Sequence, residues 1–505
     1  MSVLFTDVRL YDQAAPDGLS GATDVLVEGD RITAVGPRGS VRREWEPDSV
    51  VAGGGHHVLL PGLVNGHFHS PANHLKGSLP SLPLEEFMLY ESPADPSLKP
   101  SPREAYLRTM LAALEMLRTG ATSVQDDAFL MPSPEPDIID AVMSAYADCG
   151  IRAAVALDQP ELPEIDKLPF LGSDAGPALR ATLADPPPMD RAGLLDAYRH
   201  LIGTWHGACD GRLTAAVSIS APQRVSEQYF GDLDALSREH RIPLFAHMLE
   251  TKVQRVLAAE QPRFRGRSLV RYTADLGLLS DRMNVIHAVW VDDADLDLIA
   301  GAGAVIAHNP VSNLRLGSGV MPFRRVRDRG IEVCLGIDEA ICDDSANLWG
   351  VVKMAGLVHN IGGRPSDTWP TATEVLDCVW SGGAAAMLRR GELGRVEPGY
   401  LADLILLDLN TAAFTPFNDL AGQLVYCEDG SSVRLTMVAG TVVALDGRVL
   451  TVDEDELLAE ARELFAARRP LIAAARRGSE AVIGDYRAMV RRAAATDVGM
   501  SRWVG

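Results

Sequence analysis

Short apolar runs separated by turn residues mark both ends of this chain. In the first sixty residues, Val3–Tyr11, Asp24–Val27 and Arg31–Val35 have the length and composition of β-strands, with Gly, Asp and Pro between them. The pattern returns only near the other end, where Ala402–Leu407 predicts a buried strand and Val433–Leu450 divides into two further strands. We therefore predict one β-domain assembled from both termini.

The middle of the chain, from about 61 to 395, alternates strand-like apolar runs with segments long enough for helices, such as Pro102–Thr119 and Gln228–Arg241. Repeated alternation of this kind favours a parallel barrel with functional sites at the carboxyl ends of its strands. The tail from Asp453 onward predicts two amphipathic helices, which could dock on the chain's own barrel or on a second subunit. The candidate strands are Ser123–Gln125, Ala153–Leu157, Thr214–Ile219, Leu244–His247, Asn284–His287, Ala304–His308 and Glu332–Ile337.

Composition and charge narrow the class of protein. Hydrophobic residues make up 47% and charged residues 23% of the 505 residues, as in folded globular proteins. The net charge of −21 would repel a phosphate backbone, so we expect no nucleic-acid polymer as a partner. We expect no membrane association either, because no apolar run approaches the length of a membrane span and the N-terminus does not resemble a signal peptide. The six cysteines are scattered without a CxxC pair, which favours reduced thiols and a cytoplasmic protein.

Two histidines separated by one residue, His67 and His69, follow the apolar run Val58–Val64. On a strand, residues two apart face the same side, so both imidazoles point together. Two neutral imidazoles on one rigid strand provide half of a divalent-metal site. The pair by itself is weak evidence, because many histidines are only structural. Its position after a strand that leaves a Pro-Gly turn strengthens the metal interpretation.

A third histidine, His247, ends the strand Pro243–Ala246, and Glu250 follows three residues later. If a turn begins at His247, Glu250 lies on the same side, one layer out from a metal bound by the histidine. A carboxylate in that position could shuttle protons between a bound water and a leaving group. The alternative is an acidic residue favoured only by the dipole of a helix start, an effect worth under about 1 kcal/mol.

An acidic residue, Asp338, follows the apolar strand Val333–Ile337. A carboxylate at the mouth of a barrel strand can complete an ion's shell and accept a proton from its water, although it could instead cap a following helix. His287 ends the strand Met283–Ile286 and is a candidate base or electrophile, or a core histidine bonded to a backbone carbonyl. Four strand-end His and Asp positions in one βα pattern arise by chance much less often than any single one.

These residues stand in motifs that resemble the amidohydrolase superfamily, in the branch that holds nucleobase, adenosine-type and triazine deaminases and chlorohydrolases. The matching segments cover about residues 1 to 450 in family order. Within the branch, Asn309–Pro322 and Asp338–Trp349 are most similar to members that act on triazines. The matching segments are Leu60–His69, Glu115–Thr122, His247–Glu250, His287–Trp290, Asn309–Gly319, Gly336–Asp338 and Gly394–Leu404.

The resemblance implies an α/β protein with a (β/α)8 TIM barrel and a β-sandwich built from both termini, in agreement with the pattern of apolar runs. On this basis we expect residues 1–60 and 396–450 to form a composite β-sandwich. Residues 61–395 would form the metal-dependent catalytic barrel, and residues 451–505 a C-terminal helical extension.

The resemblance also implies which residues act. Glu250, His287 and Asp338 would be catalytic, transferring protons and contacting substrate. Two-metal members carry a bridging lysine in the fourth barrel strand, and Leu213–Ser220, the expected fourth strand, contains none. We therefore expect one divalent ion per subunit, Zn²⁺ as the first choice and Fe²⁺ as the alternative. The implied metal ligands are His67, His69, His247 and Asp338.

The implied activity is metal-dependent hydrolytic deamination of an aminated N-heterocycle of purine, pterin, pyrimidine or triazine type. The ion would activate a water molecule, Asp338 and His287 would accept its proton, and Glu250 would protonate the ring nitrogen and help ammonia leave. An alternative is hydrolysis of another C–N or C–Cl bond, in a cyclic amide, an N-alkylamine or a chloro-heterocycle, because pocket shape decides the leaving group. A noncatalytic scaffold is the alternative from another class, which the intact ligand set disfavours.

Two departures from the family pattern concern the substrate, a small molecule. Where many deaminases of this branch have His-Ala-Pro after the fourth strand, this chain has Ser220–Arg224. Glu339, directly after Asp338, is unusual and could contact an exocyclic amine or ring N–H, or bond outward. Family members are often oligomers, so we expect a homodimer or larger assembly. Further candidate substrate contacts, each with loop packing or capping as an equal alternative, are Trp290, Asn313, Arg315, His74 and Lys76.

Overall fold

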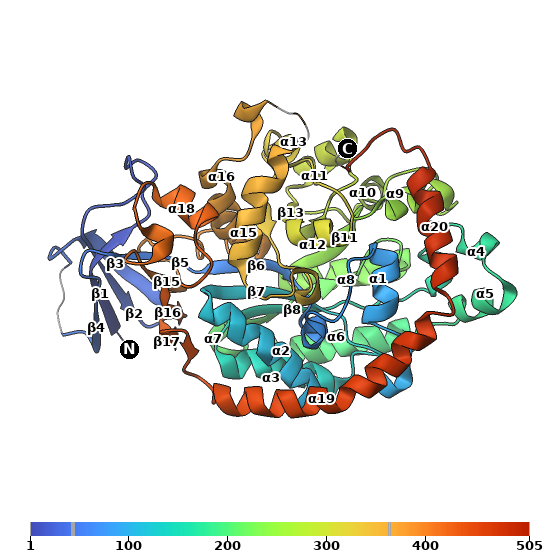
Figure 1. The fold of residues 1–505 in the computed structure, drawn as a ribbon, viewed down its shortest axis with the longest axis horizontal. Helices are drawn as coiled ribbons and strands as arrows, with labels where there is room; N and C mark the ends of the chain where they lie inside the picture. Colours follow the sequence, from blue (N-terminus) through green and yellow to red (C-terminus); the bar gives the residue numbers. More distant parts are fainter. Residues whose placement is uncertain (1, 42–45, 362, 364, 504–505) are drawn as a thin grey trace.

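The computed structural model describes residues 2–41, 46–361, 363 and 365–503. Its centre is a set of parallel strands in which almost every residue is buried, which explains their continuously apolar sequences. Figure 1 shows β6, β7 and β8 side by side at the centre of the molecule. The strands are β6 (Leu63–Phe68), β7 (Ala121–Ala128), β8 (Arg152–Leu157), β9 (Leu213–Ala215), β10 (Val217–Ser218), β11 (Leu244–Met248), β12 (Met283–His287), β13 (Val305–His308) and β14 (Val333–Leu335).

Two parallel sheets, β6 to β9 and β10 to β14, join at both edges to form the predicted barrel. At one edge, β9 and β10 are consecutive pieces of one extended segment, of which β9 pairs with β8 and β10 with β11. At the other edge, Phe68 and Asp338 form a parallel bridge, and the backbone N–H of Asp338 donates to the carbonyl of His67 at 3.0 Å. Asp338 therefore closes the barrel at its carboxyl end.

Helices connect the strands and cover the outside of the barrel (Figure 1). The long helix α2 begins with Pro102 directly after Ser101, whose hydroxyl accepts the backbone N–H of Glu104 at 3.2 Å, because these residue types satisfy or remove the free N–H groups of a helix start. Among the described residues, no helix is both long and apolar enough to cross a bilayer. The helices are α1 (Leu84–Glu91), α2 (Pro102–Arg118), α3 (Pro136–Cys149), α4 (Leu171–Asp174), α5 (Pro177–Leu183), α6 (Arg191–Trp205), α7 (Ala208–Gly211), α8 (Glu227–His240), α9 (Lys252–Glu260), α10 (Leu269–Asp275), α11 (Asp293–Ala302), α12 (Pro310–Arg315), α13 (Phe323–Arg327), α14 (Ala340–Asp343), α15 (Leu348–Leu357), α16 (Ala372–Asp377), α17 (Gly383–Ala386), α18 (Leu420–Tyr426), α19 (Glu454–Ser479) and α20 (Ile483–Ala495).

Strands from both ends of the chain form a second sheet beside the barrel, as predicted. Its order is β18-β17-β16-β15-β5-β1-β2-β3, with β4 on β1, and the antiparallel pairing of β5 with β15 joins the two termini. Side chains from β1, β2, β15 and β16 pack into one apolar core, including Phe5, Val25, Leu404 and Met437. The strands are β1 (Ser2–Leu10), β2 (Thr23–Glu28), β3 (Arg31–Pro37), β4 (Ser49–Ala52), β5 (His57–Pro61), β15 (Leu404–Asp408), β16 (Val433–Val438), β17 (Thr441–Leu445) and β18 (Arg448–Val449).

Three details differ from the predicted strands. The segment Val433–Leu450 contains a third strand, β18, of only two residues. The apolar run Val58–Val64 is divided between β5 of the outer sheet and β6 of the barrel, and Gly62 lies between them where a Cβ atom would meet Thr122 at 2.2 Å. Strand β14 ends at Leu335, two residues earlier than predicted, because the chain then turns to bring Asp338 against β6.

The two C-terminal helices pack on their own chain, the first of the two alternatives for this tail. Helix α19 runs along α2 and reaches α1, and α20 continues past α1, α9 and α4 (Figure 1). Arginines bind backbone carbonyls of the barrel loops, with Arg468 Nη2 donating to the Leu98 carbonyl and Arg476 Nε to the Tyr90 carbonyl, both at 2.8 Å. The arginines spaced along α19 therefore fasten it to the barrel.

A buried ion pair links the barrel to the outer sheet and provides a test of the fold. Arg152 of β8 donates to Asp403 through Nε at 2.7 Å and Nη2 at 3.0 Å, and both side chains are almost fully buried. We expect Asp403→Asn to cost about 3–5 kcal/mol, because it leaves the Arg152 charge buried without a partner. The measurement is the urea midpoint of unfolding. Glu397→Gln, which breaks the exposed Arg395–Glu397 pair, is the control and should change stability by less than about 1 kcal/mol; equal midpoints for both variants would contradict the expectation.

Candidate metal centre

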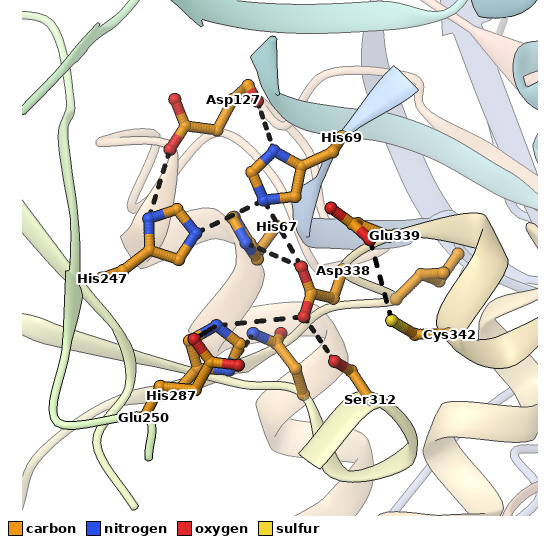
Figure 2. Close-up of polar contacts among 12 residues, drawn as sticks. His67, His69, Asp127, His247, Glu250, His287, Ser312, Asp338, Glu339 and Cys342 are labelled. Carbon is orange, nitrogen blue, oxygen red and sulfur yellow. Dashed lines mark hydrogen bonds and ion pairs between the residues drawn. The ribbon is translucent and has the colours of Figure 1, made fainter. Parts of the chain in front are cut away.

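Four predicted metal-binding side chains meet at the carboxyl end of the barrel (Figure 2). His67 and His69 come from the end of β6, His247 from β11 and Asp338 from the turn after β14, and none is more than 8% exposed. Asp338 Oδ1 lies 3.3 Å from His67 Nε2 and 3.4 Å from His69 Nε2, and His69 Nε2 lies 3.3 Å from His247 Nε2. Two donor atoms bound to one tetrahedral zinc are about 3.4 Å apart. The spacing therefore matches a single ion.

Hydrogen bonds to the backbone determine which ring nitrogens face the centre. His69 Nδ1 lies 2.5 Å from the carbonyl of Asp127, and His247 Nδ1 lies 2.7 Å from the carbonyl of Ser220. A carbonyl only accepts, so both Nδ1 atoms carry the proton and both Nε2 atoms present lone pairs. His67 Nε2 is buried and has no hydrogen-bond partner among the described residues. Two lone pairs, an unpaired third nitrogen and a carboxylate directed at one another are unfavourable unless a cation lies between them.

The protonation states of these side chains also favour a bound cation. Burial lowers the pKa of His67 to about 3 and that of His247 to about 3, so both rings are neutral at pH 7. Burial opposes ionisation of Asp338, but the imidazoles beside it, His67 above all, favour its carboxylate form and hold its pKa below the usual range. Its other oxygen, Oδ2, accepts the hydroxyl of Ser312 at 2.6 Å. Neutral imidazoles and an ionised carboxylate are the forms that bind a divalent cation.

Two residues of the site have strained backbones. His287 has φ of 72° and Asp338 has φ of 68°, a left-handed conformation that costs of order 1–3 kcal/mol for a residue other than glycine. For Asp338 the strain is offset by the hydrogen bonds that hold it against β6, including the one that the backbone N–H of His69 donates to its carbonyl at 3.2 Å. The left-handed backbone directs the side chains of His287 and Asp338 toward each other at the ends of their strands.

Beside the four side chains lie two groups suited to proton transfer. His287 Nε2 is 3.6 Å from Glu250 Oε2 and 3.9 Å from Asp338 Oδ2, while His287 Nδ1 is held by Asn313 Oδ1 at 3.0 Å (Figure 2). Burial lowers the pKa of His287 to about 4, so this ring is neutral. Burial raises the pKa of Glu250 well above its usual value, and the charges of Asp338 and Glu85 add to the effect. Asn313 thus binds Nδ1 of His287, the ring nitrogen that does not face Glu250.

A cavity of about 30 Å³ adjoins the cluster. Glu339, one of the predicted substrate contacts, borders it, and burial together with the charge of Glu91 raises the pKa of Glu339 well above its usual value. A carboxyl group kept protonated can donate as well as accept a hydrogen bond. The residues that line the cavity are His69, Leu84, Met88, Phe129, Asp158, Arg224, His247, Glu250, His287, Leu316, Asp338 and Glu339.

Two other predicted substrate contacts lie elsewhere. Trp290 is fully buried, and its indole N–H donates to the carbonyl of Ser318 at 2.7 Å. Arg315 Nη2 donates to the carbonyl of Leu79 at 2.9 Å and lies 3.0 Å from Asp344 Oδ2. Within the described part of the chain, neither residue is among those that line the cavity. Both have the structural role that was the alternative in each case.

Two residues of the loop after β6 also have structural partners. His74 stacks on Phe465 of α19 with ring centroids 5.2 Å apart, and it lines a neighbouring cavity of about 70 Å³ that also touches His69. Lys76 forms an ion pair with Glu115 at 2.9 Å. His74 thus lines a separate cavity that shares His69 and Phe129 with the small cavity beside the metal centre.

Three further residues contribute to the site without having been predicted. Asp127 lies near the end of β7, Asp158 follows β8, and the Asp158 carboxylate is 3.9 Å from His69 Nδ1. Arg224 lines the cavity and donates from Nη1 to the hydroxyl of Ser220 at 3.0 Å. The sequence carried a signal for Asp127 and Asp158. Each is an acidic residue at the carboxyl end of a barrel strand, the feature that also identified Asp338.

Comparisons with known proteins agree with this geometry. The model of the Amidohydrolase family matches residues 58–443. The chain is 33% identical over 430 residues to a 5-methylthioadenosine/S-adenosylhomocysteine deaminase of Nitratidesulfovibrio vulgaris, covering 84% of this chain and 88% of the relative. It is 28% identical to a 5'-deoxyadenosine deaminase of Methanopyrus kandleri, covering 86% of this chain and 92% of that one.

Solved structures show the same fold. An adenosine deaminase from Xanthomonas campestris with bound zinc has a TM-score of 0.78 at 23% identity, covering 92% of this chain and 98% of its own. Atrazine chlorohydrolase from Arthrobacter aurescens, complexed with zinc, also has a TM-score of 0.78 at 23% identity, covering 92% of this chain and all of its own. With the family model matched over most of its length, the chain belongs to the amidohydrolase family.

Proposed function

We propose that the protein is a metal-dependent hydrolase that removes the exocyclic amino group of an aminated N-heterocycle of the adenosine type, releasing ammonia. The observation that carries the proposal is the convergence of three imidazole nitrogens and one carboxylate at 3.3–3.4 Å beside a buried acid. The deaminase relatives named above support the choice of leaving group and of substrate class.

Each side chain of the site has a role in this proposal. A divalent cation held by His67, His69, His247 and Asp338 would supply Lewis-acid activation of a water molecule. His287 is neutral, and its Nε2 can accept a proton or a hydrogen bond from a group bound between it and Asp338.

Glu250 would donate a proton, whereas His287 would accept one. Its raised pKa favours the protonated carboxyl group, whose proton can pass to a ring nitrogen and then assist the departing amine. The walls of the cavity are largely buried, so a seated ring would exclude bulk water from this transfer.

We also propose that one Zn²⁺ binds per chain. Three imidazoles and a carboxylate suit zinc, and the fourth barrel strand carries no lysine that could bridge a second ion. Fe²⁺ is the alternative, and metal analysis separates the two.

The division of the chain into 1–60 with 396–450, 61–395 and 451–505 is likewise a proposal, supported by the shared core of β1, β2, β15 and β16. All six cysteines are free, which supports a reducing compartment such as the cytoplasm. A homodimer or larger assembly stays a prediction from the family resemblance.

The direct test is ammonia release from a panel of aminated purines, adenosines, pterins, pyrimidines and triazines. We expect the zinc-loaded protein to release ammonia fastest from an adenosine-type compound, to lose this activity after treatment with a chelator, and to regain it with added zinc. Release of chloride or an alkylamine from a triazine without ammonia release from any amine would favour the alternative leaving groups. No stoichiometric metal and no turnover would favour a noncatalytic scaffold.

Glu250→Gln should keep its metal and lose about 10²–10⁴-fold in kcat, because the amide is nearly isosteric but cannot deliver a proton. Turnover and metal content are measured on the same sample. Glu260→Gln, at the exposed end of α9, is the matched control and should behave as wild type. Near-normal turnover by Glu250→Gln would remove this carboxyl group from the mechanism.

The pH profile of kcat should have two limbs. Turnover needs His287 neutral, so it should fall as the pH drops toward about 4, where this ring takes up a proton. Turnover also needs Glu250 protonated, so it should fall at high pH as the pH passes the raised pKa of this group. The residual activity of Glu250→Gln should lack the alkaline limb, since glutamine does not ionise. An unchanged alkaline limb in that variant would assign it to another group.

A further inference from the structure

A third and much larger cavity, of about 630 Å³, borders the small cavity beside the metal centre. It shares Leu84, Met88, Phe129 and Arg224 with the small cavity, so the two cavities lie next to each other along this wall. Its volume lies in the range of pockets that hold a whole small-molecule ligand. The cluster would therefore hold only the reacting end of a substrate, with ample room for the remainder.

The surface of this large cavity is mainly apolar. Leu168, Leu183, Met189 and Val253 are among its lining residues, together with several prolines. Two of its charged residues neutralise each other, since Lys167 Nζ lies 2.8 Å from Glu164 Oε2. Such a surface favours an apolar group without a net charge.

One wall of the large cavity comes from the C-terminal helices, which lie outside the residues matched by the family model. The wall consists mostly of small residues of α19, including Ala475 and Gly478, and it ends with Val482 and with Tyr486 of α20. The Ser479 hydroxyl donates to the carbonyl of Leu89 in α1 at 2.6 Å. Figure 1 shows α20 beside α1 and near α4 and α5, on the opposite side of the molecule from the sheet of β1 to β4.

An unpaired polar group lines the large cavity. Gln223 is 3% exposed, lines the large cavity, and its Oε1 has no hydrogen-bond partner among the described residues. A buried acceptor without a donor costs free energy that a bound ligand can recover. The neighbouring residue, Arg224, borders both cavities. The free acceptor of Gln223 fits a ligand with a hydrogen-bond donor, and the Arg224 guanidinium, which only donates, fits an acceptor on the ligand near the junction of the two cavities.

We propose that α19 and α20 complete a pocket for a bulky apolar substituent, and that the protein prefers heterocyclic amines that carry one. The inference rests on the proposed function for the reacting end of the substrate. The small residues of α19 make the pocket wide, and Gln223 binds the polar portion between ring and substituent.

Gly478→Phe tests the pocket directly. A Cβ atom on Gly478 would have no atom of the described residues within 4 Å, and Gly478 lies within helix α19, so a larger side chain can enter the cavity without backbone strain. Gly484→Phe is the matched control, because this glycine of α20 also has open space but does not line the cavity. Gly478→Leu gives an intermediate volume. Zinc content and circular dichroism report whether each variant is folded.

The probes are adenosine, 5'-methylthioadenosine and a 5'-hexylthio homologue, compared by kcat/KM for ammonia release and by calorimetric binding. In wild type each buried methylene should raise kcat/KM by about fourfold. Gly478→Phe should reduce the preference for the hexylthio compound over adenosine on the order of tenfold, mainly through KM, and leave adenosine within about twofold. Gly484→Phe should leave the preference unchanged.

An unchanged preference in folded Gly478→Phe, or a wild-type protein that treats adenosine and the hexylthio compound alike, would overturn the proposal. Binding of the hexylthio compound that is lost in Gly478→Phe, without ammonia release by wild type, would support the pocket and count against the deaminase activity alone. Failure of the proposed pocket and failure of the proposed deaminase activity therefore give different results.

Discussion

The site depends on one electrostatic constraint, which is that three imidazole nitrogens and a carboxylate are buried facing one another. Buried acceptors without donors are costly, and like-signed partial charges at 3.3 Å repel. A cation at their common point converts the repulsion into binding. The carbonyls of Asp127 and Ser220 enforce the arrangement, because each accepts the hydrogen bond of one ring's Nδ1–H and leaves the Nε2 of that ring bare. Metal affinity is thus built into the backbone around the site.

The same constraint ties the metal centre to the closure of the barrel. Asp338 is both the carboxylate of the cluster and the residue whose backbone bridges the last strand to the first. Its left-handed backbone is held by hydrogen bonds on both sides, so a change that loosens this seam would displace the carboxylate. The stability of the fold and the geometry of the site are therefore coupled at Asp338. A separate contact, the buried pair of Arg152 and Asp403, joins the barrel to the outer sheet.

The residues of the site come from regions that lie far apart in the sequence. The strand ends supply the reactive groups, in positions set by the period of the barrel. Helix α1 contributes Leu84 and Met88 to both cavities, and α19 and α20 supply a wall for the larger one. The reacting groups are thus fixed by rigid strands, whereas the size of the substituent depends on a helical wall that can vary without disturbing the metal centre.

The sequence alone determined the barrel, the sheet from both termini and the groups at the strand ends, because strand period and βα alternation act locally and place His67, His69, His247 and Asp338 on one rim. It could not determine where side chains beyond the strand ends point. Trp290 and Arg315 follow strand ends too, yet the loops turn them toward Ser318 and Asp344. The apolar wall around Gly478 was equally hidden, since an amphipathic helix shows that one face is buried but not what it covers. Only packing between distant segments decides this, and no local pattern records it.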